Sequence, residues 1–305
     1  RCPERMEPRM RTNRFAILLS GFALAGLAHA DLAFKDDTGQ EIRLKAPARR
    51  IVALAPHIAE SLYAAGAGDK LVGTVDYSDY PPEAKKVARV GGYSRIDLEA
   101  IAALKPDLVL AWESGNNMPQ INKLKALGLT VYVSQPNRMD NVADQLERLG
   151  QLAGTEGVAK PAAESFRQRL DGLRKANASK PKVRVFYQIW KTPLMTVGGQ
   201  QIISDAIKLC GGENVFGHLG KMAPTVSVEA VLEADPEAIV ATGMGDSKPE
   251  WLHDWDKWTK MTAVKRNNLF HINPDIMQRH TPRILEGAEK LCAHLDVARS
   301  HRPTK

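Results

Sequence analysis

The sequence predicts an α/β protein made of two related halves that a helical segment joins. Short apolar runs alternate with short helical patterns along most of the 305 residues, a length sufficient for two modest domains. The stretch IDLEAIAALKPDLVLA (96–111) is matched by VSVEAVLEADPEAIVA (226–241), with a Glu, the following Ala and a Pro seven positions later in each. The segment between the halves has helical periodicity, whereas a flexible linker would be rich in Gly and Ser.

Residues 1–30 have the pattern of upstream sequence followed by a secretory signal peptide. A basic stretch at 10–14 precedes an apolar core at 15–27, and the segment closes on AHA at 28–30. The core is shorter than the roughly 20 residues of a membrane span, although an anchor is the alternative. We expect residues 1–9 to precede the true start, and an exported, soluble mature chain that begins at Asp31.

The charge of the chain argues against nucleic acid as a partner. The net charge is +7, but residues 1–30 contribute five Arg against two Glu. Acids and bases are interspersed over the remainder, and no basic stripe with interleaved aromatic residues occurs.

The mature chain opens with the pattern of a β-hairpin. DLAFKDDTGQEIRL places two alternating runs around Asp37-Thr38-Gly39, a tight-turn sequence. RRIVALAP predicts a buried strand, HIAESLYAAGAG a helix ended by glycines, and KLVGTV the next strand.

The matched stretches predict the same local structure twice. Asp97 and Ser227 are suitable N-caps, and prolines at 106 and 236 end the helices expected over 98–104 and 228–234. DLVLAW and EAIVAT are the strands that follow. Upstream, LYAAGAGDKLVG (62–73) aligns with AIKLCGGENVFG (206–217). An internal duplication explains this order, and two helices obeying the same capping rules is the alternative.

Two helices are expected between the halves. Asp140 caps the first, which Gly154 ends, and Pro161 is tolerable only near the first turn of the second. The second has an apolar face at Val158, Ala162, Phe166, Leu170 and Leu173. We therefore divide the mature chain into a first lobe (31–150), a linking helix (151–180) and a second lobe (181–300).

An exported two-lobed chain suggests capture of a ligand in a cleft between the lobes. No G-x-S-x-G, P-loop, H-E-x-x-H or helix-opening G-x-G-x-x-G occurs, which disfavours the alternative of an exported two-domain enzyme. Ligands of open α/β sheets bind beyond the carboxyl ends of the strands. Those ends are rich in Tyr and Trp, which suit a large planar ligand or merely close the core. They lie near Ala55-Pro56-His57, Asp76-Tyr77, Trp112-Glu113, Gln188–Trp190 and Asn273–Asp275.

Several motifs resemble the periplasmic cobalamin-binding proteins of ABC importers, within a wider family that also captures ferric siderophores, haem and metals. They are RIVALAPHIAESLYAAG, DYSDYPPEAKKVARVGG, DLEAIAALKPDLVLAW, KVRVFYQIWKTPLMTVGG, CGGENVF, VSVEAVLEADPEAIVATG and PRILEGAEKLCAHL, which together span nearly the whole mature chain. The resemblance implies two Rossmann-like lobes bridged by one long helix, a periplasmic location, and a corrinoid as bound ligand rather than a catalytic cofactor.

The resemblance and the strand ends together predict a set of ligand-cleft residues. Tyr77, Trp112 and Asp275 match cleft positions of the family, with Arg279 nearby, whereas Tyr93 and Met195 stand where members carry Trp and Phe. Pro56, His57 and Trp190 are added from the strand ends, and Trp190 offers the ring that the family carries at the position of Ala223. His57 could serve as axial ligand to cobalt or to haem iron. Haem stays open as the alternative ligand. An anionic siderophore would need more arginines than Arg95 and Arg279, and a zinc or manganese site would need more ligands than this cleft offers.

Two further implications concern the partner and the cysteines. Glu99 and Glu229 match exposed carboxylates that meet arginines of the permease, although Glu in a first turn also stabilises a helix by itself. We expect a monomer that touches the membrane only through that complex. Cys210 and Cys292, which from spacing alone are either a bridge or two thiols, match a disulfide worth at most about 4 to 4.5 kcal/mol.

Overall fold

The computed structural model describes residues 31–92, 94–243 and 249–303. It begins with the predicted hairpin, β1 (Leu32–Lys35) paired antiparallel with β2 (Glu41–Leu44). Gly39 takes φ +82° at the turn, a value that glycine adopts at little cost. The side chain of Asp36 closes the turn by accepting hydrogen bonds from the backbone N–H groups of Thr38 (3.0 Å) and Gln40 (2.9 Å).

The first lobe is built on a five-stranded parallel sheet with the order β5-β4-β3-β6-β7. Its strands are β3 (Ile51–Ala53), β4 (Leu71–Thr74), β5 (Ala88–Arg89), β6 (Leu108–Trp112) and β7 (Val131–Ser134). Helices α1 (Pro56–Ala64), α2 (Leu98–Ala103) and α3 (Met118–Ala126) connect them, with single 3₁₀ turns at Gly68–Lys70 and Pro82–Lys86.

The second lobe repeats the arrangement with four parallel strands in the order β11-β10-β8-β9. These are β8 (Val183–Gln188), β9 (Gly212–Asn214), β10 (Ala238–Ala241) and β11 (Leu269–His271). Its helices are α6 (Ile202–Leu209), α7 (Val228–Ala234), α8 (Thr262–Lys265), α9 (Pro274–Met277) and α10 (Ile284–Ser300), with a 3₁₀ turn at Glu250–Trp255. The order β4-β3-β6-β7 thus recurs as β9-β8-β10-β11, which supports a duplication.

The matched stretches form the same structure, as predicted. Asp97 caps α2 by accepting from the backbone N–H groups of Glu99 and Ala100, both at 3.0 Å, and Ser227 caps α7 by accepting from that of Ala230 at 3.1 Å. In each unit the residue directly before the proline lies in the left-handed region, at φ 47° for Lys105 and φ 38° for Asp235.

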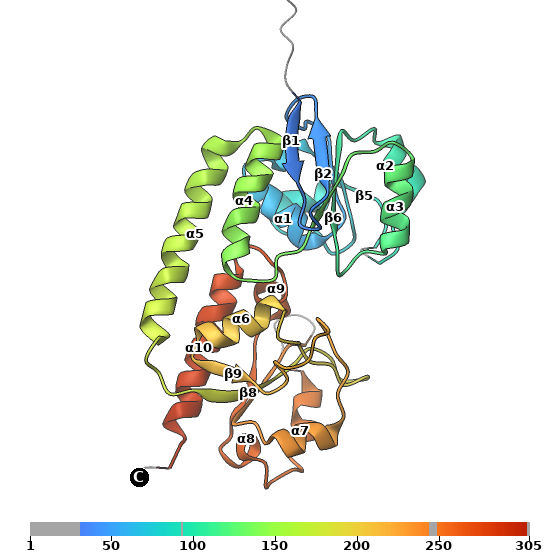
Figure 1. Ribbon diagram of the computed structural model, residues 1–305. Helices are drawn as coiled ribbons and strands as arrows, with labels where there is room; N and C mark the ends of the chain where they lie inside the picture. Colours follow the sequence, from blue (N-terminus) through green and yellow to red (C-terminus); the bar gives the residue numbers. More distant parts are fainter. Residues whose placement is uncertain (1–30, 93, 244–248, 304–305) are drawn as a thin grey trace, which may run out of the picture. The chain divides into compact units, whose positions relative to one another are not determined.

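Two antiparallel helices, α4 (Asp140–Ala153) and α5 (Glu156–Asn177), link the lobes along the chain and lie side by side, with α5 running along the side of both lobes (Figure 1). Gly154 ends α4 at φ +67°, as expected, whereas the prediction of Asp140 as the cap was wrong, because Asp140 is the first residue of the helix and Met139 holds the cap position. Pro161 was expected near the first turn of the second helix, and it is the sixth residue of α5, just past that turn. Val158, predicted on the apolar face, is 54% exposed, because Ala159 is the residue that turns inward. The two-lobed α/β fold is confirmed.

One hydrophobic core spans both lobes. It includes residues of β3 and α1 from the first lobe, of β8, α6 and α10 from the second, and of α4 and α5 between them. Separate clusters cover the other face of each sheet. A shared core restrains the movement of one lobe relative to the other, because sliding would expose apolar surface.

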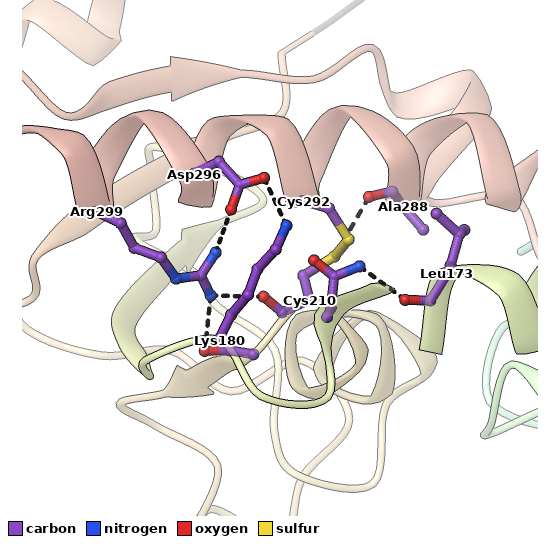
Figure 2. The surroundings of a disulfide bond; sticks show 9 residues. Leu173, Lys180, Cys210, Ala288, Cys292, Asp296 and Arg299 are labelled. Carbon is purple, nitrogen blue, oxygen red and sulfur yellow. Dashed lines mark hydrogen bonds and ion pairs between the residues drawn. A yellow bond between two sulfur atoms is a disulfide. The ribbon is translucent and has the colours of Figure 1, made fainter. Parts of the chain in front are cut away.

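A disulfide joins Cys210, at the end of α6, to Cys292 in α10, with the Cα atoms 4.7 Å apart. Beside it, Arg299 donates to the carbonyl of Cys210 (2.8 Å), and Lys180 pairs with Asp296 (Figure 2). The predicted pairing is confirmed. Within the described residues, no helix has the length and apolar character needed to traverse a bilayer.

Candidate ligand-binding site

The predicted ligand residues of the first lobe lie at the carboxyl ends of its parallel strands. His57 opens α1 after β3, Tyr77 follows β4, and Trp112 is the last residue of β6. Because β4, β3 and β6 are neighbours in the sheet, these positions meet at one edge. Asp275 enters the same region from the second lobe, on α9 after β11. These residues lie at the strand ends, where the sequence placed them. Their role in ligand binding stays a prediction.

Three rings from both lobes pack together at this edge. The ring centroids of His57 and Trp112 are 5.0 Å apart, those of His57 and His280 5.1 Å, and those of Trp112 and His280 5.8 Å. Trp112 meets both imidazoles edge to face, a favourable aromatic geometry. His280 comes from the loop between α9 and α10 of the second lobe, so the cluster joins the lobes.

Both imidazoles are neutral at pH 7. Burial lowers the pKa of His280 to about 4. Burial also lowers the pKa of His57 well below its ordinary value, and the electrostatic effects of His280 and Arg279 lower it further. The Nε2 atom of His57, the Nδ1 atom of His280 and the Nε1 atom of Trp112 are buried without a hydrogen-bond partner among the described residues. Buried polar atoms of this kind call for a ligand or water as partner.

The ligation of a metal by His57 is constrained by this packing. The His57 side chain is only 4% exposed and packs against Trp112 and His280. Among the residues described, no three His, Cys, Asp or Glu side chains converge as a metal site. A ligand metal would reach Nε2 only after the ring had moved, and the axial role of His57 stays a prediction.

A buried ion pair spans the lobes beside the aromatic rings. Glu60 of α1 is 3% exposed and accepts from Arg283 Nε at 2.6 Å and from Arg283 Nη2 at 2.7 Å. This fork geometry raises the pKa of Arg283, chiefly through the hydrogen bond to Glu60. The guanidinium also lies over the ring of Tyr80, 3.7 Å from its centroid.

Arg279 extends the pair into a five-residue junction cluster, which consists of Glu60, Asp79, Asp275, Arg279 and Arg283. Arg279 Nη1 lies 2.8 Å from Asp79 Oδ1 and 3.8 Å from Glu60 Oε2, and its Nη2 lies 3.0 Å from Asp275 Oδ1. Burial opposes ionisation of Asp79, but the hydrogen bond from Arg279 and its charge lower the pKa of that carboxyl overall.

The sequence prediction included Asp275 and Arg279 but missed Glu60, Asp79 and Arg283. Glu60 carried a signal, since a carboxylate among the buried positions of α1 requires a partner. Its partner lies 223 residues away, beyond the reach of a local pattern.

Two of the remaining predicted ligand residues, Tyr77 and Trp190, lie at the surface. Tyr77, at φ 63°, is 70% exposed, and Trp190 is 45% exposed with its indole N–H donating to the carbonyl of Thr192 at 3.0 Å. Met195 is partly buried and forms an antiparallel β-bridge with Trp190. Pro56 is half-buried as the first residue of α1. Tyr93 lies outside the described residues.

The two predicted docking carboxylates are exposed in the first turns of α2 and α7. The backbone N–H of Glu229 and the side chain of Ser227 lower the pKa of Glu229. Glu99 borders a hollow of about 440 Å³ with Arg95 and Gln120. Val228, next to Glu229, borders a pocket of about 160 Å³ that includes Trp251, Trp255 and Trp258.

The segment with Trp190 and Met195 is tied to the start of α7. Met195 forms a β-bridge with Thr225, and the backbone N–H of Val226 donates to the carbonyl of Leu194 at 3.0 Å. Ser227, the N-cap of α7, follows directly. A ligand that moves this segment would therefore act on the helix that carries Glu229.

A larger cavity lies away from these residues. Its volume is about 620 Å³, and its walls include Arg138, Arg174, Lys208 and Gly212. None of the predicted ligand residues that the structure describes lines it. The chemistry of the strand ends, rather than cavity size, therefore identifies the candidate site.

Comparison with known proteins agrees with this arrangement. Residues 51–276 match the family described as periplasmic binding protein. The vitamin B12-binding protein of Vibrio cholerae serotype O1 is 40% identical over 253 residues, which cover 83% of this chain and 91% of the relative. The vitamin B12-binding protein of Yersinia pestis is 38% identical over 259 residues, covering 83% and 90%.

Solved structures share the fold. The crystal structure of the periplasmic vitamin B12-binding protein BtuF of Vibrio cholerae superposes with a TM-score of 0.77 at 39% identity, covering 83% of this chain and 98% of that one. A periplasmic haem-binding protein from Pseudomonas aeruginosa reaches 0.71 at 24% identity, covering 85% and 95%, and shows likeness of fold alone. The similarity is to binding proteins, which sets aside the alternative of an enzyme. The chain belongs to the periplasmic binding protein family.

Proposed function

We propose that this protein captures cobalamin, or a related corrinoid, in the periplasm and delivers it to an ABC importer of the inner membrane. The observation that carries the proposal is the meeting of aromatic and charged side chains from both lobes at the strand ends. The sequence identity of 40% and 38% to two vitamin B12-binding proteins supports cobalamin as the ligand.

The site offers the contacts that a corrinoid needs. The exposed rings of Tyr77 and Trp190 provide flat apolar surfaces for a large ring system. Trp112 contributes a buried indole N–H without an acceptor. Arg279 and Asp275 supply a donor and an acceptor for amide side chains. The core shared by the lobes favours a small closure around the ligand.

Calorimetric titration of the chain from Asp31 onward with cyanocobalamin tests the proposal. We expect one-to-one binding with a Kd below about one micromolar, which corresponds to a binding free energy of about −8 kcal/mol or lower. Binding of haemin, with no measurable binding of cyanocobalamin, would contradict it and move the protein to a haem-binding function.

Haem is the second candidate, because His57 and His280 place two imidazoles next to Trp112. The same position would let His57 ligate the cobalt of a corrinoid with a labile axial ligand. A shift of the visible spectrum with aquocobalamin, absent with cyanocobalamin and absent in His57→Ala, would support ligation. An unshifted spectrum on binding of aquocobalamin would exclude it.

Delivery would use Glu99 and Glu229 as docking carboxylates for arginines of the permease. Both are exposed, and each is oriented by the first turn of a capped helix, one in each lobe. A single receptor presenting two matched carboxylates suits a partner made of two similar subunits, so we propose a monomer as the working form. Export by the signal peptide of residues 10–30, which lie outside the described residues, completes the proposal.

A further inference from the structure

We propose that Glu60 and Asp79 make the site selective for a tetrapyrrole with uncharged amide side chains over one with carboxylates. This inference rests on the proposed function and concerns which chemical class of ring the same site accepts. The carboxylates act by neutralising Arg279 and Arg283, the two guanidinium groups of the junction cluster, before a ligand arrives.

The geometry leaves neither guanidinium unpaired. Arg283 gives Nε and Nη2 to Glu60, and its face is covered by Tyr80. Arg279 gives Nη1 to Asp79 and Nη2 to Asp275. A ligand carboxylate that accepts from a remaining N–H group of Arg279 would lie beside Asp79 and Asp275. Their negative charges would offset the attraction to the guanidinium.

The charges of the cluster also oppose an anion. Three carboxylates face two guanidinium groups. The imidazoles of His57 and His280 add no positive charge, because burial lowers both pKa values. The ammonium group of Lys85 acts on Asp79 from an exposed position, where solvent screens it. The net electrostatic interaction between the described cluster and a ligand carboxylate is therefore repulsive or close to zero.

An amide, in contrast, matches what the cluster still offers. Asp79 and Asp275 have side chains 47% and 43% exposed, so carboxylate lone pairs remain accessible. The amide NH₂ group can donate to these oxygens, while the amide carbonyl can accept from Arg279. Neither contact requires a bound ion to leave. Haem carries two propionates and no amide, so the junction cluster should disfavour its binding.

The test compares two corrinoids that share ring and axial ligands. Dicyanocobinamide carries amides where dicyanocobyrinic acid carries carboxylates. We expect wild-type protein to prefer the amide ligand at least about a hundredfold in Kd. Glu60→Gln and Asp79→Asn should each reduce this preference about tenfold, mainly by improving the binding of the carboxylate ligand. That improvement should weaken as salt is raised.

A matched control separates charge from stability. Glu147→Gln removes a carboxylate that pairs with Arg167 at 2.6 Å between α4 and α5, away from the junction cluster. It should leave the preference unchanged. Asp79 is half-exposed, so Asp79→Asn keeps the test valid even if Glu60→Gln folds poorly. A preference that stays unchanged in Asp79→Asn and in any folded Glu60→Gln would overturn the inference. Failure of wild-type protein to bind cyanocobalamin would instead overturn the proposed function.

Discussion

Glu60 and Arg283, 223 residues apart in the chain, form a two-point ion pair that joins the first lobe to the second. Glu60 is 3% exposed. Two oxygens of one carboxylate meet two nitrogens of one guanidinium, which is the geometry in which a buried pair best offsets the cost of removing its charges from water.

Removal of one partner should therefore be costly. We expect Glu60→Ala to lower the free energy of unfolding by about 3 kcal/mol, because Arg283, whose side chain is only 18% exposed, would lose its counter-charge. Urea denaturation measures this loss. The control is Glu289→Ala, which breaks an exposed pair with Arg169 and should cost less than about 1 kcal/mol. If both substitutions lowered the free energy of unfolding equally, the Glu60–Arg283 pair would stabilise the protein no more than an exposed ion pair does.

Acidification should destabilise the protein through His57 and His280. The folded state lowers both pKa values, to about 4 for His280, so the unfolded chain binds more protons once the pH falls below about 6.5. The stability is present above pH 6.5 and is lost as the pH falls towards 4, at about 1.4 kcal/mol per pH unit for each histidine. Denaturation between pH 5 and 6.5, before most carboxylates titrate, isolates this effect.

The matched variants for the pH experiment are His280→Gln and His218→Gln. His280→Gln should remove its share of the slope, whereas His218 is exposed and its replacement should leave the slope unchanged. A pH dependence in His280→Gln as steep as that of the wild type would count against a neutral buried imidazole.

The disulfide between Cys210 and Cys292 closes a loop with a sequence separation of 82. By the chain-entropy relation, loss of the bridge should lower the free energy of unfolding by at most about 4.5 kcal/mol. The double variant Cys210→Ala/Cys292→Ala should unfold at lower urea concentration, and dithiothreitol should not destabilise it further. Wild-type protein should approach the variant when reduced. A variant as stable as the oxidised protein would contradict the estimate.

Reversal of the docking charges should separate uptake from capture. We expect Glu99→Lys/Glu229→Lys to abolish cyanocobalamin uptake by cells that depend on this protein, while calorimetry finds the ligand affinity retained. Glu164→Lys is the control, because Glu164 is exposed on α5, outside the two helices that carry the docking carboxylates. Loss of ligand affinity in the double variant, or loss of uptake in the control, would argue against docking.

Local patterns predicted the hairpin, the duplicated cap-helix-proline-strand units and the two helices between the lobes. Asp97, Ser227 and Gly154 act within a few residues of their own positions, so hydrogen bonding and backbone preference are visible in the sequence. The exposed Val158 was misplaced because helical periodicity fixes a stripe only to within about one residue, and packing against α4 selected Ala159.

The ligand residues show the same division. Their positions after β3, β4, β6 and β11 follow from the order of strands and from the resemblance to a known family, both of which the chain contains. Glu60 and Asp79 did not appear among them, because their partners, Arg283 and Arg279, come from the other lobe.

By itself, the sequence determined the fold class, the strand-end positions of the site and the residues that cap and end each repeated unit. Only the tertiary structure decided that the two arginines of the junction are already neutralised and that the two imidazoles are buried. Capping and turn formation depend on neighbours in the chain. The charge state and pairing of a buried group depend on neighbours in space, which the folding of both lobes around a shared core brings together.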